Sequence, residues 1–241
     1  MIELKEAPKW KTVYESERAG LYDAFIFSAA MNYQGSLDAV LQMAARTPRP
    51  VRRVLDLGAG TGILTEQVLR RFPEASALAV DGSAAMLEQA SKRLTPYKDR
   101  VTLDCRSFES LDSSLDGRYD LIVSSFALHH MDHQAMRELL RRLHSVLEPG
   151  GQLVVADYVL TASPRLQGWY EETWVEHRLN QSPASGKTKS QMMREHEATK
   201  AAEGDNPALL ADLVAWTREA GFVDADCHWK YYCYAVYGGV K

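Results

Sequence analysis

Hydrophobic and polar positions alternate through the middle of the chain in a way that predicts strands and helices in turn. Five short apolar runs have the length of buried strands: 51–57, 76–80, 101–105, 119–124 and 152–156. Three segments between them carry apolar residues at helical spacing: 61–72, 83–94 and 134–146. Strands that alternate with helices are typical of βαβ units, in which helices cover both faces of a parallel sheet.

The flanks of this region follow other patterns. Before it, 19–45 has helical spacing and stops at Thr47-Pro48-Arg49-Pro50. After it, the spacing predicts three helices and two strands: 169–179, 191–202, 208–220, 226–230 and 231–236. The polar run 181–189 contains Pro, Gly and Ser and reads as a loop.

Composition limits the classes of function. The chain has 241 residues, of which 46% are hydrophobic, and a net charge of -4 without any block of Lys and Arg, so no nucleic-acid partner is expected. No apolar run reaches the ~20 residues of a membrane span, and 1–10 resembles neither a signal peptide nor an anchor. The three cysteines form no CxxC pair and suit a reducing compartment, so we expect a cytoplasmic protein.

The most informative segment runs from Asp56 to Gly62 and reads Asp-Leu-Gly-Ala-Gly-Thr-Gly, between a strand and a helix. Such a turn lets a ligand approach the backbone at a helix N-terminus. A dinucleotide fingerprint would need a small residue at 63, where the chain has Ile63, so the spacing is G-x-G-x-G. Asp81 ends the next strand, about 20 residues later, where a carboxylate can accept both hydroxyls of a ribose.

These residues resemble the first motifs of class I S-adenosylmethionine-dependent methyltransferases, particularly the small-molecule and ubiquinone-type branch. Two later motifs strengthen the resemblance, Tyr119 to His130 and Leu147 to Leu153, and together the motifs span about 51–158. The resemblance implies an α/β, Rossmann-like, doubly wound, mostly parallel seven-stranded sheet. We expect one domain, 1–241, with four parts: an N-terminal helical cap (1–46), a cofactor-binding core (51–160), a helical insertion after strand five that completes the cap (161–205), and a C-terminal helix and strands (206–241).

The same resemblance implies S-adenosylmethionine as cofactor and S-adenosylhomocysteine as product. In the family, Asp81 would bind the ribose and Met86 would lie near the adenine. One departure concerns Arg106-Ser107-Phe108, which stands where many members have Asp followed by an apolar residue. The candidate cofactor-binding residues are Asp56, Gly58, Ala59, Gly60, Gly62, Asp81, Gly82, Ser83, Met86, Arg106, Ser107, Phe108, Ser124 and Phe126.

Methyl transfer needs an acceptor held in line and, where the acceptor carries a proton, a general base. His129 and His130 follow the fourth strand and are the candidate bases, with core packing or capping as their other reading. No metal is expected, because adjacent histidines point different ways unless the backbone turns sharply. The candidate cap residues are Tyr14, Tyr33, Asp157, Trp169 and Trp174, and we expect the cap to order when ligands bind.

Three alternatives stay open beside methylation of a small molecule. One is methylation of tRNA or another nucleic acid, and another is a protein that binds the cofactor without transferring methyl. The aromatic helices of the cap could instead build a homodimer interface. An NAD-dependent oxidoreductase is disfavoured by Ile63.

Overall fold

A computed structural model describes residue 14 and residues 17–108, 111, 115, 117–182 and 185–241. Residues 1–13 of the predicted N-terminal cap, Trp10 among them, lie outside the described part. The helices are α2 (Tyr22–Ala29), α3 (Tyr33–Ala44), α4 (Ile63–Arg71), α5 (Ala84–Arg93), α6 (His133–Val146), α7 (Pro164–Gln181), α8 (Lys189–Glu203) and α9 (Leu210–Glu219), with short 3-10 turns at Glu17–Leu21, Thr95–Tyr97 and Leu128–His130. No helix within these ranges is long and apolar enough to cross a membrane.

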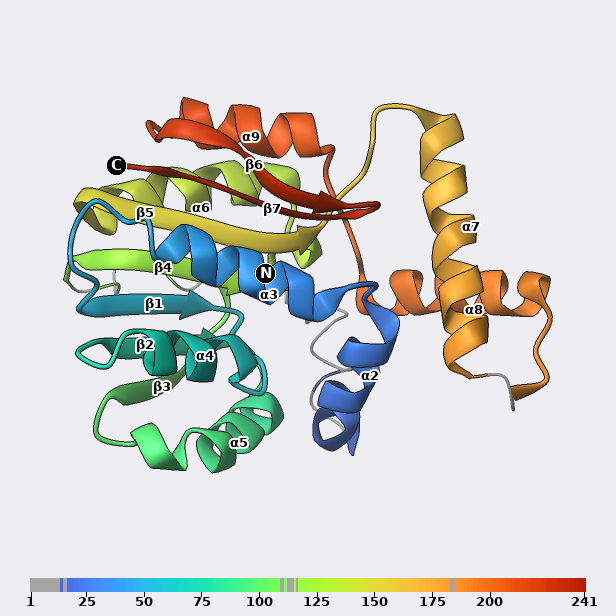
Figure 1. The fold of residues 1–241 in the computed structure, drawn as a ribbon, viewed down its shortest axis with the longest axis horizontal. Helices are drawn as coiled ribbons and strands as arrows, with labels where there is room; N and C mark the ends of the chain where they lie inside the picture. The colour runs from blue at the N-terminus through green and yellow to red at the C-terminus, as the bar shows by residue number, and fades with distance from the viewer. Residues whose placement is uncertain (1–13, 15–16, 109–110, 112–114, 116, 183–184) are drawn as a thin grey trace, which may run out of the picture.

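One seven-stranded sheet organises the molecule, in the order β3-β2-β1-β4-β5-β7-β6 (Figure 1). Its strands are β1 (Arg53–Leu57), β2 (Ser76–Asp81), β3 (Val101–Cys105), β4 (Tyr119–Ser125), β5 (Leu147–Tyr158), β6 (Val223–Tyr231) and β7 (Tyr234–Val240). The first five run parallel, and β7 is antiparallel to β5 and β6. The predicted doubly wound, mostly parallel α/β sheet is confirmed.

Alternate residues of each strand serve two hydrophobic cores. Val54 belongs to the core on the face that α3, α4 and α5 cover, whereas Leu55 belongs to the opposite core with α6 and α9. Both residues are at most 1% exposed. Because successive side chains of a strand point to opposite faces, a continuous apolar run is what a sheet covered on both sides requires.

Three helices stand beyond the carboxyl ends of the parallel strands. Figure 1 shows α7 and α8 at the end toward which β1 and β5 point, with α2 between them and the sheet. Trp174 of α7 donates from Nε1 to the carbonyl of Ala29, 2.8 Å away, which fixes α7 against the end of α2. The insertion after strand five therefore forms the predicted cap.

The structure corrects two details of the predicted elements. The helical pattern expected over 19–45 is divided into α2 and α3, because Asn32 is left-handed with a φ of 58°. The last two strands were expected to meet between Lys230 and Tyr231, but the turn lies at Tyr232 and Cys233. Tyr232 takes a φ of 52° there, a conformation that the Tyr-rich run does not announce, since Gly or Asn usually marks it.

Candidate functional site

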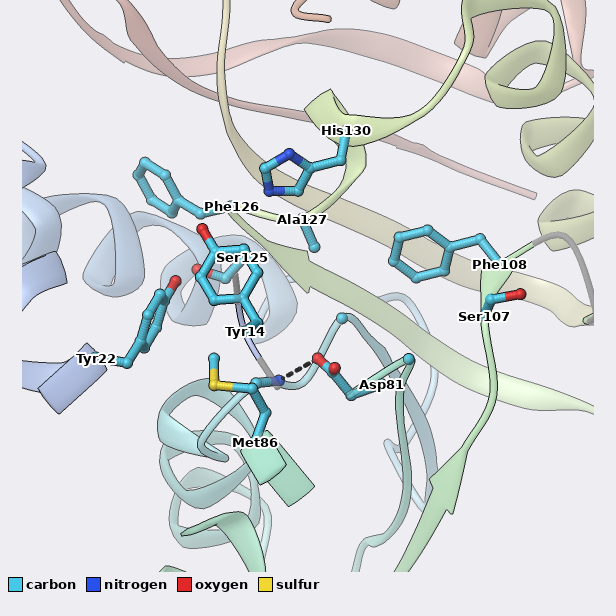
Figure 2. A pocket seen from close by; sticks show the side chains of 13 residues that line it. Tyr14, Tyr22, Asp81, Met86, Ser107, Phe108, Ser125, Phe126, Ala127 and His130 are labelled. Atoms are coloured by element: carbon cyan, nitrogen blue, oxygen red, sulfur yellow. Dashed lines mark hydrogen bonds between the residues drawn. The ribbon is translucent and has the colours of Figure 1, made fainter. Parts of the chain in front are cut away.

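A cavity opens where β1, β2 and β4 end, at the point where the strand order reverses direction. In Figure 2, Tyr14, Tyr22 and Phe126 gather on one side of it, and Ser107 and Phe108 lie on the other. We call it the first cavity. Its lining consists of Tyr14, Tyr22, Gly58, Gly60, Asp81, Gly82, Met86, Ser107, Phe108, Ser125, Phe126, Ala127 and His130.

The glycine loop needs its glycines for different reasons. Gly58, Gly60 and Gly62 all have positive φ, a region that side chains with a Cβ rarely adopt. A Cβ at Gly58 would lie 2.1 Å from that of Ala127, so this loop lies directly against the residues after β4. At Gly60 the nearest atom would be the Cε of Met86, at 3.4 Å, and Gly60 faces the cavity. The loop is thus a backbone surface that a ligand can touch.

Asp81 joins the loop to the start of α5. Its Oδ2 accepts a hydrogen bond from the backbone N–H of Gly60 at 2.8 Å (Figure 2). Its Oδ1 accepts one from the backbone N–H of Ser83 at the same distance. Burial raises the pKa of the carboxyl group, while the two N–H donors lower it. Each oxygen has a further lone pair, so the carboxylate can also accept from a ligand in the first cavity.

The structure divides the predicted cofactor residues into two groups. One group lines the first cavity: Gly58, Gly60, Asp81, Gly82, Met86, Ser107, Phe108 and Phe126. The other group supports it from behind: Asp56, Ala59, Gly62, Ser83, Arg106 and Ser124. Asp56 is the clearest of these, because it is 1% exposed and its Oδ2 accepts from Thr65 Oγ1 at 2.5 Å. Burial raises the pKa of Asp56 to about 7.

A second cavity adjoins the first and shares three of its residues, Tyr14, Tyr22 and Phe126. Helices α2, α7 and α8 supply most of its remaining wall. Phe126 stands between the two cavities with a φ of 53°, and its N–H donates to the carbonyl of Ala156 at 2.8 Å. Such a backbone costs of order 1–3 kcal/mol in a non-glycine residue and is found preferentially at functional sites.

Two histidines on the 3-10 turn after β4 face different cavities. His130 lines the first cavity and His129 the second, and their ring centroids are 4.1 Å apart. Nδ1 of His129 lies 2.5 Å from Oδ1 of the buried Asp157. Nδ1 of His130 lies 3.2 Å from Oδ1 of Asp205, which comes from the segment after α8.

The two rings have opposite protonation tendencies. Burial lowers the pKa of His129, but Asp157, Asp205 and Glu203 together outweigh burial, and the net pKa is raised. For His130, burial and the neighbouring His129 lower the pKa, and Asp205 only partly offsets them. Near neutral pH, His130 is therefore the neutral member of the pair, with a ring nitrogen able to accept a proton.

The 3-10 turn after β4 lies against the segment after α8, and it brings together three groups that were not expected from the sequence to lie close to one another. His129, His130 and Asp205 each offer one ligand atom, and these atoms lie within 4.8 Å of one another, close enough to hold a cation. The 3-10 turn at Leu128–His130 is the sharp backbone turn under which adjacent histidine rings need not point apart, and the two ring centroids lie 4.1 Å apart. Their pairing with Asp157 and Asp205 accounts for the cluster by hydrogen bonding and charge, and the expectation of no metal stays a prediction.

The candidate cap residues have different positions. Tyr14 lines both cavities and Trp174 lines the second. Tyr33 and Asp157 are buried behind the cavities, where Tyr33 packs against Phe126. Trp169 is 53% exposed and packs on Tyr232, outside the lining of either cavity.

Several lining residues were not singled out in the sequence. Ser125 could have been found from strand alternation, because Ser124 points inward and donates from Oγ to the Leu57 carbonyl at 2.7 Å, so its neighbour faces the other way. Arg178, His196 and Asp205 line the second cavity from the insertion. No local pattern marks them, since only the packing of α7 and α8 on α2 brings them to the site.

Comparison with known proteins gives one answer for the core. The family model described as "Methyltransferase domain" matches residues 54–151. Trans-aconitate 2-methyltransferase of Deinococcus radiodurans is 42% identical over 109 residues, which cover 44% of this chain and 38% of that protein. An uncharacterized methyltransferase of Mycobacterium tuberculosis is 31% identical over 150 residues, which cover 62% of this chain and 68% of the relative. The chain thus spans well under half the length of the first of these relatives.

Solved structures extend the likeness to the whole fold. An O-methyltransferase family protein from Burkholderia thailandensis superposes with a TM-score of 0.70 at 18% identity, over 98% of this chain and 63% of its own. At that identity the likeness concerns the fold alone. The insertion and the N-terminal helices thus belong to an architecture seen elsewhere, while the sequence similarity is concentrated in the core.

Proposed function

The chain belongs to the S-adenosylmethionine-dependent methyltransferases, and we propose that it methylates a small molecule held in the second cavity. The observation that carries this proposal is the junction of the two cavities at Tyr14, Tyr22 and Phe126. A cofactor in the first cavity and an acceptor in the second would meet there. The family's cofactor supplies a methyl group on an activated sulfonium, so positioning can provide up to ~7–11 kcal/mol of the barrier reduction.

The residues of the first cavity fit the cofactor. Asp81 offers acceptor lone pairs to two ribose hydroxyls, and Gly60 offers a backbone surface without a Cβ. Phe108 and Met86 supply apolar contact for a flat ring, and Ser107 adds a polar group beside them. At Arg106-Ser107-Phe108, where many members of the family have an Asp, these uncharged side chains would contact the adenine instead.

We assign the proton-accepting role to His130. It lines the first cavity, it is close to the junction through its contact with Tyr14, and its lowered pKa keeps it neutral near pH 7. Asp157 holds His129, and His129 in turn packs against His130. His129 is thereby a positioning residue in this proposal, and His130 would remove a proton from an acceptor hydroxyl or amine.

The second cavity favours a small acceptor over a nucleic acid. Three helices supply most of its wall, and its lining is mainly aromatic and apolar. A relative's name specifies trans-aconitate, a small molecule, but the match covers only 44% of this chain, and the family model ends at residue 151, before α7 and α8. The identity of the acceptor therefore rests on this chain's own cap.

Calorimetry and a turnover assay test the proposal together. We expect micromolar binding of S-adenosylhomocysteine, no binding of NAD, and cofactor-dependent methylation of members of a small-molecule acceptor panel. His130→Gln should lower turnover about 10²–10⁴-fold for acceptors that carry a proton, without changing the affinity for S-adenosylhomocysteine.

Asp226→Asn, an exposed change on β6 that lies outside the lining of both cavities, is the control and should behave as the unchanged protein. Binding of NAD in place of S-adenosylhomocysteine would contradict the cofactor assignment. Cofactor binding without methylation of any acceptor would favour the alternative of a binding protein. Preferential methylation of tRNA would favour the nucleic-acid alternative.

A further inference from the structure

Arg178 on α7 lines the second cavity in a setting that differs from that of the other basic residues there. Lys200 has Glu171 at 3.5 Å, and His129 has Asp157. Burial lowers the pKa of His196 to about 4, so that ring is neutral. Among the described residues, no carboxylate forms an ion pair with Arg178, whose side chain is half-buried. The cavity wall thus carries a cation with no acidic partner in the part of the chain that the structure describes.

The guanidinium is held in place by groups that do not neutralise it. Its Nη1 donates to the hydroxyl of Ser28 at 2.7 Å. Its central carbon lies 5.9 Å from the ring centroid of Phe25 and 5.8 Å from that of Trp174. Arginine has five N–H donors in a planar fork, and the bonds within the described residues use one of them. The others leave room for a planar anion.

The acidic residues of the cavity are already engaged elsewhere. Glu195 pairs with Lys187 at 2.6 Å, and Asp205 lies against His130 at 3.2 Å. Glu203, the third acid of the lining, is 8% exposed, and its charge helps to raise the pKa of His129. A ligand that enters the cavity therefore meets aromatic faces, three acids that interact with other groups, and one arginine without a carboxylate partner among the described residues. A buried or half-buried charge is energetically unfavourable unless it is paired. An anionic ligand would pair with Arg178, and this ion pair would offset the free-energy cost of burying the charge.

We propose that Arg178 binds a carboxylate, or an anion of similar shape, on the acceptor itself. The apolar body of the acceptor would then pack against Tyr22, Phe126 and Trp174, with its accepting atom directed to the junction of the cavities. This inference rests on the proposed function and specifies its acceptor class as a compact, apolar acid. Arginine suits the task because its fork can donate two parallel hydrogen bonds to a carboxylate.

A purely structural role is the competing explanation, because Arg178 also ties α7 to Ser28. The preceding residue provides a matched control, since Nε2 of His177 lies 3.2 Å from the backbone carbonyl of the same Ser28. His177 is not among the residues that line the second cavity. A change at His177 therefore perturbs the same helix contact without removing the cation.

The test compares acids with uncharged amides of the same shape. Calorimetry in the presence of S-adenosylhomocysteine measures the affinities of 4-hydroxybenzoate and 4-hydroxybenzamide, and of indole-3-acetate and indole-3-acetamide. We expect the unchanged protein to prefer at least one acid over its amide by about tenfold or more. Arg178→Met should abolish the preference, Arg178→Lys should retain part of it, and His177→Leu should leave it unchanged.

Equal affinity for acid and amide in both pairs would overturn the inference, and so would failure of both acids to bind. A preference that survives in Arg178→Met would overturn it as well. The affinity for S-adenosylhomocysteine, measured on the same samples, separates this outcome from failure of the proposed function. If the wild-type protein does not bind S-adenosylhomocysteine, the proposed function is contradicted. If it binds S-adenosylhomocysteine but does not prefer acids over amides, only the role of Arg178 is contradicted.

Discussion

The cofactor half and the acceptor half of the site are built in different ways. The cofactor half consists of backbone turns at the ends of β1, β2 and β4, fixed by hydrogen bonds such as the one from Gly60 to Asp81. The proposed acceptor half consists mainly of side chains from α2, α7 and α8, which stand beyond the carboxyl ends of the parallel strands. The family model ends at residue 151, before the insertion begins.

This difference teaches where specificity resides. We call the loop from Gly58 to Gly62, together with Asp81, the backbone cradle. It restricts the sequence strongly, because glycine is needed wherever φ is positive or a neighbour lies close. A cavity made of helix side chains can change its lining while the helices stay in place. The family model accordingly covers the core, and in the proposed function the acceptor is chosen by helices that lie outside the matched residues.

Removing Asp81 should produce the largest loss in the cofactor half. Asp81→Ala deletes a charged acceptor for two ribose hydroxyls, each such bond being worth roughly 1.5–3 kcal/mol. It also frees the N–H groups of Gly60 and Ser83. We expect S-adenosylhomocysteine to bind at least ~100-fold more weakly by calorimetry. An unchanged dissociation constant would refute the ribose role, and Trp174→Leu in the cap should alter it far less.

A pair of glycine substitutions should separate the stability of the two halves. Gly58→Ala places a Cβ 2.1 Å from Ala127 at a φ of +67° and should destabilise the fold by about 2–4 kcal/mol in urea unfolding. Gly168 lies in α7 with nothing within 4 Å of its Cβ position, so Gly168→Ala should be stabilising by about 0.4–1 kcal/mol. Equal effects of the two changes would contradict the contrast between a close-fitting cradle and an adaptable cap.

The backbone cradle could be predicted from the sequence, because its conformation depends on residues that are close together in the chain. The spacing of Gly58, Gly60 and Gly62 and the later Asp81 follow from one strand–turn–helix unit and the strand after it. Arg178 and Asp205 could not be found in this way. Their roles depend on how α7 and α8 pack, which no periodicity specifies, and α8 has a polar sequence with buried positions at Met192 and Glu203 alone.

The break at Asn32 illustrates the same limit in the N-terminal helices. The helical spacing over 19–45 does not mark where the helices divide. Tyr33 is 5% exposed and packs on Phe126, and the left-handed Asn32 turns the chain so that this contact forms. Tertiary packing here outweighed the local preference.

The pair of His129 and Asp157 should make stability depend on pH. The folded pKa of His129 is raised above the unfolded value of ~6.5, so its contribution is complete below that value and is lost as pH rises through the folded pKa. Asp157→Asn removes the largest of the influences that raise this pKa, while burial still lowers it and Asp205 and Glu203 still raise it. We expect the variant to lose about 1–3 kcal/mol at pH 6 and less at pH 9, by urea unfolding at each pH. A loss that is larger at pH 9 would contradict the assignment.

The smallest effect should appear in the connection between α7 and α8. Gly186 and Lys187 are exposed there, and Lys187 pairs with Glu195 of α8, a residue that lines the second cavity. A ligand in that cavity would stabilise α8 against local unfolding. Because cleavage requires local opening of the chain, proteolysis near Gly186 should slow a few-fold. Cleavage within the cradle should be slow throughout.

The lid and the homodimer interface differ in what changes this protection. A lid gives protection that follows S-adenosylhomocysteine and acceptor at any protein concentration, since it closes over its own cavity. An interface gives protection that rises with protein concentration and ignores ligand, because it depends on association. Limited proteolysis over a range of dilutions, with and without ligand, distinguishes them. If cleavage near Gly186 changes with neither ligand nor protein concentration, the cap is as rigid as the cradle. The two halves would then differ in sequence but not in mobility.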